Sequence, residues 1–588
     1  MNFIKKHWLY ILVGLLIIYG IFIRFQGLGY SEFQGDETNP LRFMGDYYGK
    51  RAGITEFYSF LLEQKRGPGQ YIINYINVFI FGFHGEFFIR LPFFIFSVLA
   101  FFSMYKLAAK MFDKQVALFS VLFLALNGLY IAFARITQYQ TFMYFVTPLA
   151  IFLYLQAFEN KNFKKTALSG FLLSLCLLGH YDTLTVGSFF AFFLLAYIIR
   201  KPKDFKYVLK SSGVFLLFFL VPAVLFYIPF FRDSYYTETT SSYLTGRLFG
   251  SGFMPRTPWS ELGKLLTLYM PIEAWVLFFA TIIGGILSFI FQLGDIKILK
   301  IKFKKSFVWI SYFLANIFLF LVVIYSYFSD KPVSFPMKPR LSTLLVYLIS
   351  FGIIGTLLLS KKVKAKHVGL VSWFLLSFSI YFFFIKDPRT HVYITFMPAF
   401  ILSGFTFANI LKIKYPVIKW GLALAIILYY FYLSAFYWIV FVNKNPEYPW
   451  WDKTLFSRQL YNLQRVRHKK VDGVFGFNNK RHWQEIRDLY DKGCLTGSYN
   501  SNEKNSVTTF YLGFDQTFPK KPDLVLGADT IFVDAGPHSW YYWDVKKVIA
   551  ESDYNLIYTF KNKDYPVNYV LGKSSVYPDK SFLKDACY

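Results

Sequence analysis

Charged residues are scarce in this chain of 588 amino acids, and acidic residues are especially few. Only 17% of the residues are charged, and 35 Asp and Glu face 63 Lys and Arg, which gives a formal net charge of +28. Hydrophobic residues make up 55% of the chain. A soluble protein does not need so much apolar surface, because a single core stops growing at about 250–300 residues. The composition therefore argues against an ordinary soluble protein and predicts a polytopic α-helical membrane protein.

The chain has only three cysteines, too few for a disulfide framework. Cys176 lies in an apolar block, whereas Cys494 and Cys587 lie near the C-terminus and could pair if that region is extracytoplasmic. The N-terminal sequence also does not have the pattern of a cleavable signal peptide. The first apolar block, at about 8–25, is too long for a signal sequence and lacks a small-residue cleavage site, so we expect a membrane anchor.

Apolar blocks of about 20 residues, the length that a helix needs to cross a bilayer, alternate with short Lys/Arg clusters. Positive side chains resist translocation, so these clusters mark cytoplasmic loops and we expect no nucleic-acid partner. The alternation predicts about 13 transmembrane helices, a cytoplasmic N-terminus and an extracytoplasmic C-terminus. The predicted spans lie at about 8–25, 88–107, 115–133, 142–158, 167–180, 183–199, 211–231, 272–292, 306–327, 341–360, 368–385, 392–411 and 420–442.

One further apolar block, residues 67–83, does not fit this alternation. A full span there would place Lys106 and Lys114 outside and would invert every later loop. The remaining basic clusters argue against that inversion. We therefore predict a helix that lies in the outer interface or dips into it.

The composition changes after residue 443. Residues 444–588 are polar, with short apolar and aromatic runs bounded by Gly, Asn, Asp and Pro, as strands and turns are. Between these runs, RHWQEIRDLYDKG has helical spacing and a terminal Gly. We predict two parts: a transmembrane domain at 1–443 with its working surface in the outer loops, and a soluble extracytoplasmic α/β domain at 444–588.

Two pairs of charged residues stand out in the first outer loop. Asp36 and Glu37 follow the first span directly. Such carboxylates can take a proton from an acceptor hydroxyl or bind a cation, and they also favour the first turn of a helix. Lys65 and Arg66 come later in the same loop, in KRGPGQY. They could bind a lipid phosphate or simply extend toward the head groups.

The other predicted outer loops carry polar and basic side chains close to the apolar spans. Charged groups at membrane depth are costly and usually face a cavity or a partner. Several of the basic residues break the positive-inside rule, which an anionic ligand would explain, and Arg suits phosphate because its planar fork is bidentate. The predicted cavity residues are Arg135, Gln138, Tyr139, His180, Asp182, Arg256 and Arg340, with Arg389 as a further phosphate-binding candidate.

Taken in order, these segments resemble the C-type (GT-C) membrane glycosyltransferases of the protein O-mannosyltransferase and lipid A aminoarabinose transferase kind. The likeness rests on the anchor followed by GDE, on EFFIRLPFFIFSVLAFFSMYKLAAKMFD, on LNGLYIAFARITQYQ and on KDPRTHVYITFMPAFIL. It covers residues 1–200 well and 380–411 moderately. The resemblance implies a plasma-membrane enzyme that transfers a hexosyl or pentosyl group, with inversion, from a polyprenyl-phosphate donor to an extracytoplasmic lipid, glycan or protein hydroxyl.

The resemblance also implies roles for individual residues. Asp36 would be the general base, with Glu37 beside it as a second catalytic candidate, and Lys65, Arg66 and Arg389 would hold the phosphate leaving group. The chain departs from the family at two places: the second outer loop has Gln138 to Gln140 where many members have an acidic residue, and KRGPGQY replaces a His/Lys-Pro-Pro motif. Neither loop has an Asp-x-Asp motif, so the sequence does not support the divalent cation that carboxylates could otherwise bind.

Two other function classes remain open. A transporter or flippase for a lipid-linked or anionic solute would explain the spans and the intramembrane charges. It would not explain the GDE loop or the soluble outer domain. A lipid-linked glycan ligase shares the donor type and is not separated by the sequence, which also does not identify the sugar or the acceptor.

Overall fold

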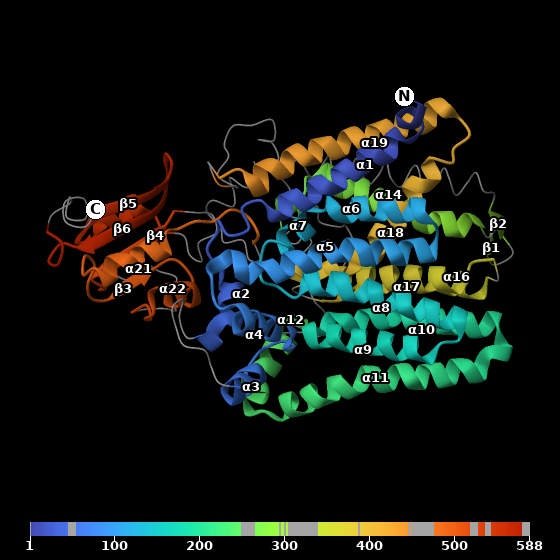
Figure 1. Cartoon of the computed structure of the whole chain (residues 1–588), viewed down its shortest axis with the longest axis horizontal. Helices are drawn as coiled ribbons and strands as arrows, with labels where there is room; N and C mark the ends of the chain where they lie inside the picture. The colour runs from blue at the N-terminus through green and yellow to red at the C-terminus, as the bar shows by residue number, and fades with distance from the viewer. Residues whose placement is uncertain are drawn as a thin grey trace.

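The computed structural model describes residues 2–44, 54–248, 265–292, 296–298, 301–303, 339–360, 362–385, 388–444, 447, 475–517, 527–535 and 543–578. Long helices run side by side in a bundle, and a smaller lobe with a sheet lies at one end (Figure 1). Within the described residues, nine helical segments are long and apolar enough to cross a membrane. This architecture confirms the predicted polytopic helical membrane protein with a C-terminal α/β domain.

The helices of the bundle coincide with the predicted spans, except that the span predicted at 115–133 is divided into two helices and that 306–327 lies outside the described residues. Their bounds are α1 (Asn2–Phe25), α5 (Gly85–Met111), α6 (Lys114–Ala125), α7 (Gly128–Phe133), α8 (Gln140–Asn160), α9 (Phe163–Gly179), α10 (Gly187–Arg200), α11 (Phe205–Arg232), α14 (Ile272–Gln292), α16 (Pro339–Leu359), α17 (Ala365–Ser379), α18 (Tyr393–Ile410) and α19 (Pro416–Tyr437). A short hairpin of β1 (Ile296–Ile298) and β2 (Ile301–Phe303), which the sequence did not predict, lies at the bundle end away from the C-terminal domain (Figure 1).

Polar residues set several helix boundaries where the chain turns between spans. Asp113 accepts a hydrogen bond from the backbone N–H of Val116, and Asn162 accepts one from Lys165, so each caps the helix that follows. Lys161 has a left-handed φ of 49° and ends α8. These turns keep successive apolar helices antiparallel.

The centre of the bundle is α18, which is buried along nearly its whole length and packs against α6 and α14. Gly404 lies directly against Ser120 of α6, and an added Cβ would clash with that neighbour. Small residues of this kind allow close helix packing in a membrane. The tightly filled core gives the outer loops a rigid base.

The block that did not fit the alternation of charges forms a short helix, α4 (Gly69–Phe81). Its 13 residues extend only about 20 Å, less than the bilayer core of about 30 Å. It lies with α2 (Gly35–Thr38) at the bundle end that adjoins the C-terminal domain (Figure 1). This length agrees with an interfacial helix rather than a span.

The C-terminal domain contains a four-stranded sheet in the order β3-β4-β6-β5. Strand β3 (Tyr499–Ser501) is parallel to β4 (Thr530–Asp534), whereas β6 (Tyr565–Lys573) is antiparallel to both β4 and β5 (Tyr554–Asn562). The helices of this domain are α21 (Trp483–Asp491), α22 (Asn505–Leu512) and α23 (Val545–Glu551). Cys494 is disulfide-bonded, and Cys587, with which the sequence left a pairing open, lies outside the described residues.

The N-terminus lies at the bundle end opposite the C-terminal domain (Figure 1). We therefore expect Lys164, Lys362 and Lys364, which lie in predicted cytoplasmic clusters, to be labelled only after permeabilisation when each is replaced by cysteine in a background without other reactive thiols. Lys546→Cys, on exposed α23, is the matched control and should react in intact cells with an impermeant reagent. Protection of position 546 in intact cells would contradict the orientation.

Candidate active site

Candidate residues from separate loops, all predicted to be outer loops, surround one cavity of about 450 Å³. Both the membrane domain and the C-terminal domain contribute to its walls. The structure therefore brings most of the predicted site residues together, while their chemical roles remain predictions. The predicted residues that line the cavity are Asp36, Glu37, Lys65, Arg66, Gln138, Tyr139, His180 and Arg389.

The first outer loop turns Asp36 and Glu37 in different directions. The Glu37 side chain is buried, and its carboxylate accepts hydrogen bonds from Arg90 Nε and Nη2, both at 2.8 Å, and from the backbone N–H groups of Thr137 and Gln34, both at 3.0 Å. Both carboxylate oxygens are thus engaged within the protein. The Asp36 side chain, by contrast, is 59% exposed. We infer that Glu37 fixes the helical turn and that Asp36 presents its carboxylate to the cavity.

Arg90 of α5 holds this loop in place. Besides its ion pair with Glu37, its guanidinium donates to the backbone carbonyls of Leu28, Ser31 and Glu32 at 2.7–3.0 Å. Arg90 is almost fully buried. The sequence analysis treated it only as part of a family-like motif and missed this function. A charged residue inside an apolar span is the signal that could have revealed it, because such a charge needs partners.

A glycine-containing turn brings two basic residues to the cavity. Gly67 and Gly69 of KRGPGQY lie against the C-terminal end of α9, where an added Cβ would clash with Leu178 or crowd Gly179. This close approach places Arg66 over the Tyr139 ring, with 6.0 Å to the centroid. Burial alone would lower the pKa of Arg66, but Tyr71 and Asp36 nearby keep that pKa above its ordinary value. Arg66 is therefore a permanent cation next to the candidate base.

Lys65 and Arg389 complete the basic wall. Lys65 Nζ lies 4.9 Å from the centroid of the Tyr243 ring. Arg389, from the loop before α18, has a left-handed φ of 43° and is partly buried. Both residues line the same cavity as Asp36. The cavity is also lined by Arg42, Lys504 and several carboxylates, and the wall formed by Lys65, Arg66 and Arg389 is the part that suits an anionic ligand.

Two side chains approach Asp36 from other parts of the fold. Gln138 Nε2 of the second outer loop lies 3.5 Å from Asp36 Oδ2, and Lys504 Nζ of the C-terminal domain lies 3.9 Å from Asp36 Oδ1. The Gln138 side chain is an amide, which can donate a hydrogen bond to the Asp36 carboxylate. The candidate base is therefore flanked by donors rather than by further carboxylates at these two positions.

Arg135 was predicted to face the cavity, and the structure places it elsewhere. It does not line the cavity, because its guanidinium donates to the backbone carbonyls of Ile23, Gln26 and Gly476 at 2.6–2.9 Å. The last carbonyls of a helix have no partner within the helix, and Arg135 satisfies them at the end of α1. Its role is to tie α1 to the C-terminal domain.

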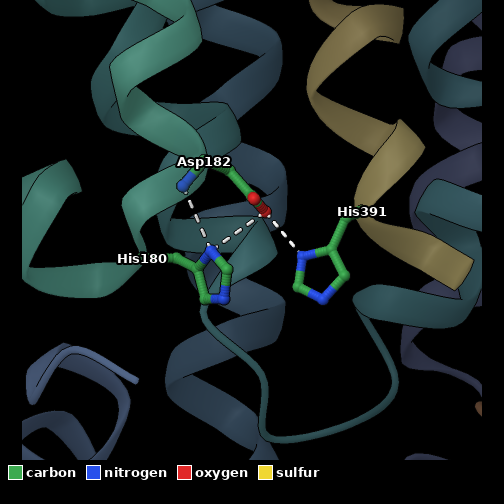
Figure 2. A group of neighbouring side chains, drawn as sticks. All are labelled: His180, Asp182 and His391. Carbon is green, nitrogen blue, oxygen red and sulfur yellow. Dashed lines mark hydrogen bonds and ion pairs between the residues drawn. The ribbon is translucent and has the colours of Figure 1, made fainter. Parts of the chain in front are cut away.

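His180, Asp182 and His391 form a compact group beside the cavity. Figure 2 shows both imidazoles turned toward one carboxylate oxygen: Asp182 Oδ2 lies 2.7 Å from His391 Nδ1 and 3.0 Å from His180 Nδ1. The hydroxyl of Tyr381 donates to Asp182 Oδ1 at 2.6 Å. Asp182 is buried behind the imidazoles, which line the cavity themselves. The sequence analysis missed His391, although it lies two residues after Arg389.

This group could hold a metal ion, since one ligand atom from each residue lies within 4.8 Å of the others. Two imidazoles and a carboxylate suit zinc or iron. Hydrogen bonds already pair these atoms, so we assign no chemical step to a metal at this position. Arg256 and the side chain of Arg340 lie outside the described part of the structure.

Residues 65–227 match the model of a family described as dolichyl-phosphate-mannose-protein mannosyltransferase. This match confirms the predicted resemblance to the C-type membrane glycosyltransferases. The matched segment includes Lys65 and Arg66, the second outer loop and the third outer loop with His180. No curated protein matches the chain.

Solved structures of two such membrane proteins are similar to this chain. The oligosaccharyltransferase AglB from Archaeoglobus fulgidus, in complex with an inhibitory peptide and a dolichol-phosphate, is 12% identical; the match covers 96% of this chain and 74% of AglB, with a TM-score of 0.45. ArnT from Cupriavidus metallidurans, bound to undecaprenyl phosphate, is 10% identical; the match covers 96% of this chain and 98% of ArnT, with a TM-score of 0.46.

Proposed function

We propose that the protein is an inverting glycosyltransferase of the plasma membrane, with its cavity on the extracytoplasmic side. It moves a sugar from a polyprenyl-phosphate donor to a hydroxyl group of an extracytoplasmic lipid, glycan or protein. The observation that carries this proposal is the convergence of Asp36 with Lys65, Arg66 and Arg389 on one cavity. The family matched by residues 65–227 is named for a sugar donor of this kind, dolichyl phosphate mannose.

The basic wall suits the leaving group of this reaction. As the bond between the anomeric carbon and the phosphate oxygen breaks, that oxygen gains negative charge. Lys65, Arg66 and Arg389 can stabilise this charge through charge-assisted hydrogen bonds, and a preorganised set of donors does so without reorganising at the moment of reaction. The polyprenyl phosphate leaves as the acceptor oxygen bonds to the anomeric carbon, so the products are polyprenyl phosphate and the glycosylated acceptor.

Asp36 suits the other half of the reaction. An acceptor hydroxyl attacks the anomeric carbon on the face opposite the departing phosphate, and its proton passes to the Asp36 carboxylate as the new bond forms. Attack from the opposite face inverts the configuration at that carbon. Glu37 and Arg90 take no part in bond making, because their hydrogen-bonding groups hold the loop.

The packing below the cavity favours an enzyme over a transporter. From the cavity, α18 runs into a bundle core filled by buried apolar side chains, including Trp373, Phe400 and Phe407. A solute that crossed the membrane along this line would have to displace them. A glycan ligase would use the same basic wall, and only the nature of the transferred group separates it from a transferase of single sugars.

The direct test is a transfer assay with the purified full-length protein in lipid nanodiscs. Polyprenyl-phosphate donors that carry a radiolabelled hexose or pentose are offered together with glycan, lipid and peptide acceptors. We expect label on an acceptor and an equal amount of free polyprenyl phosphate. In sealed vesicles, label that crosses the bilayer on an intact donor would support a flippase, and transfer only from lipid-linked polymers would support a ligase.

A further inference from the structure

The C-terminal domain forms part of the candidate active site. The described residues of this domain that line the cavity are Phe475, Asn479, Trp483, Glu503, Lys504 and Val507. They lie between the end of the membrane domain and the first turn of α22, next to the first outer loop. The domain therefore contributes a wall of the cavity.

This wall is firmly attached to the loop that carries Asp36. The buried carboxylate of Glu32 accepts hydrogen bonds from the backbone N–H groups of Arg481 and Trp483, both at 2.6 Å. The backbone N–H of Phe33 donates to the hydroxyl of Tyr511 at 2.7 Å. These hydrogen bonds fix the C-terminal domain against the first outer loop a few residues before Asp36.

Lys504 extends from this wall to the candidate base. It directly precedes α22 and passes over Gly35, where an added Cβ would clash with the lysine side chain. Its Nζ lies 3.9 Å from Asp36 Oδ1. A side chain at position 35 would displace the end of Lys504 from this position. The contact joins residues that lie far apart in the sequence.

The charges around Asp36 come from two different sources. Lys65, Arg66 and Arg389 belong to the membrane domain, from which a lipid-anchored donor must arrive. Lys504 belongs to the soluble domain. Because the acceptor attacks opposite the leaving phosphate, it has to enter on a side of the base away from the donor. The wall built by the C-terminal domain is a polar side of the cavity that does not belong to the membrane domain.

We propose that Asn479, Glu503, Lys504 and Val507 form an acceptor subsite, and that it takes the sugar hydroxyls of a neutral glycan. This inference rests on the proposed function. An amide, a carboxyl group and an ammonium group can together donate to and accept from sugar hydroxyls, while Val507 can pack against a C–H face. The subsite offers hydrogen-bond donors and acceptors side by side, which suits hydroxyl groups, since each hydroxyl both donates and accepts.

The state of Glu503 agrees with this chemistry. Burial, together with the nearby Asp534 carboxylate, raises the pKa of Glu503 to about 8. The backbone N–H of Lys504 already donates to Glu503 Oε1 at 2.6 Å. The raised pKa favours the protonated carboxyl group, which can donate a hydrogen bond to a sugar hydroxyl as well as accept one.

The test is equilibrium binding of neutral oligosaccharides to the full-length protein in nanodiscs, followed by saturation-transfer NMR. We expect the wild type to bind, Lys504→Gln and Glu503→Ala each to raise Kd about tenfold, and Lys504→Arg and Glu503→Gln, which keep the hydrogen-bonding groups, to retain most of the affinity. Lys546→Gln, in the same domain but on exposed α23, is the matched control and should bind like the wild type. In the transfer assay, Lys504→Gln should raise KM for the acceptor and leave KM for the donor unchanged.

Several results would overturn the proposal. These are oligosaccharide binding that is equal in the wild type and Lys504→Gln, saturable binding only of hydroxyl-bearing peptides, or a changed donor KM with an unchanged acceptor KM. Failure of the proposed function gives a different pattern: oligosaccharide binds at Lys504, but no sugar leaves a polyprenyl-phosphate donor.

Discussion

Replacing Asp36 with asparagine should abolish sugar transfer while expression, membrane insertion and donor binding stay largely intact. Asparagine has nearly the same shape but cannot take the proton of the acceptor hydroxyl, and loss of general-base catalysis costs about 10²–10⁴-fold in rate. The Asp36 side chain is exposed and contributes little to the packing of the protein, so its replacement should not unfold the protein. The rate of polyprenyl phosphate release by purified protein measures the effect.

Asp491→Asn is the matched control for this prediction, because Asp491 is an exposed carboxylate on α21 with a surface partner, Arg487. It should leave the transfer rate at the wild-type level. Should Asp36→Asn turn over at the wild-type rate, the assignment of the base is wrong. Asp182, together with the two imidazoles that it aligns, would then be the next group to test.

Replacing Arg90 with methionine should destabilise the protein by about 3–5 kcal/mol, the cost of leaving one partner of a buried ion pair uncompensated. Glu37 would keep its two backbone hydrogen bonds but lose the cation that balances its charge. The carbonyl groups of Leu28, Ser31 and Glu32 would lose their shared donor as well. Thermal unfolding of the detergent-purified protein, with the yield of folded protein, provides the measurement.

The double variant Glu37→Gln/Arg90→Met should be measured beside Arg90→Met. It removes both charges, so it should recover part of the stability that Arg90→Met loses, and the difference reports the coupling between the two residues. A melting temperature of Arg90→Met equal to that of the wild type would show that this ion pair does not hold the loop. The transfer rate of Arg90→Met would show how strongly the position of Asp36 depends on the ion pair between Glu37 and Arg90.

The sequence predicted the membrane helices well because their signals are local. A run of apolar residues long enough to cross a bilayer and a Lys/Arg cluster beside it can both be read without knowing any tertiary contact. The block at 67–83 shows the same point, since its short helix agrees with the loop charges that argued against a span. The C-terminal strands were less clear, and only the presence of an α/β domain was predictable.

The candidate site was predictable only in part. Asp36, Lys65, Arg66 and Arg389 were found because each is a charge in an outer loop, and the structure shows that they share a cavity. Arg135 satisfied the same criterion, yet its guanidinium binds backbone carbonyls, one of them 341 positions away in the sequence. No pattern along the chain reveals such a partner.

The same limit explains the residues that were missed. Glu503 and Lys504 lie in a polar stretch with no motif, and they become candidates only because Glu32 and Phe33 dock the C-terminal domain against the first outer loop. Arg90 looked like a motif residue, and its hydrogen bonds to three carbonyls appear only in the folded loop. Position along the chain indicated where chemistry is expected, whereas domain docking determined which groups meet.

The central claim is that one outer cavity holds the phosphate of a lipid donor next to Asp36. A cryo-EM structure of the Asp36→Asn variant in nanodiscs with a polyprenyl-phosphate sugar tests this claim most directly, because the variant should bind the donor without consuming it. The account predicts phosphate density within hydrogen-bonding distance of at least two of Lys65, Arg66 and Arg389. Phosphate density on another face of the bundle, or an empty cavity at a saturating donor concentration, would contradict it.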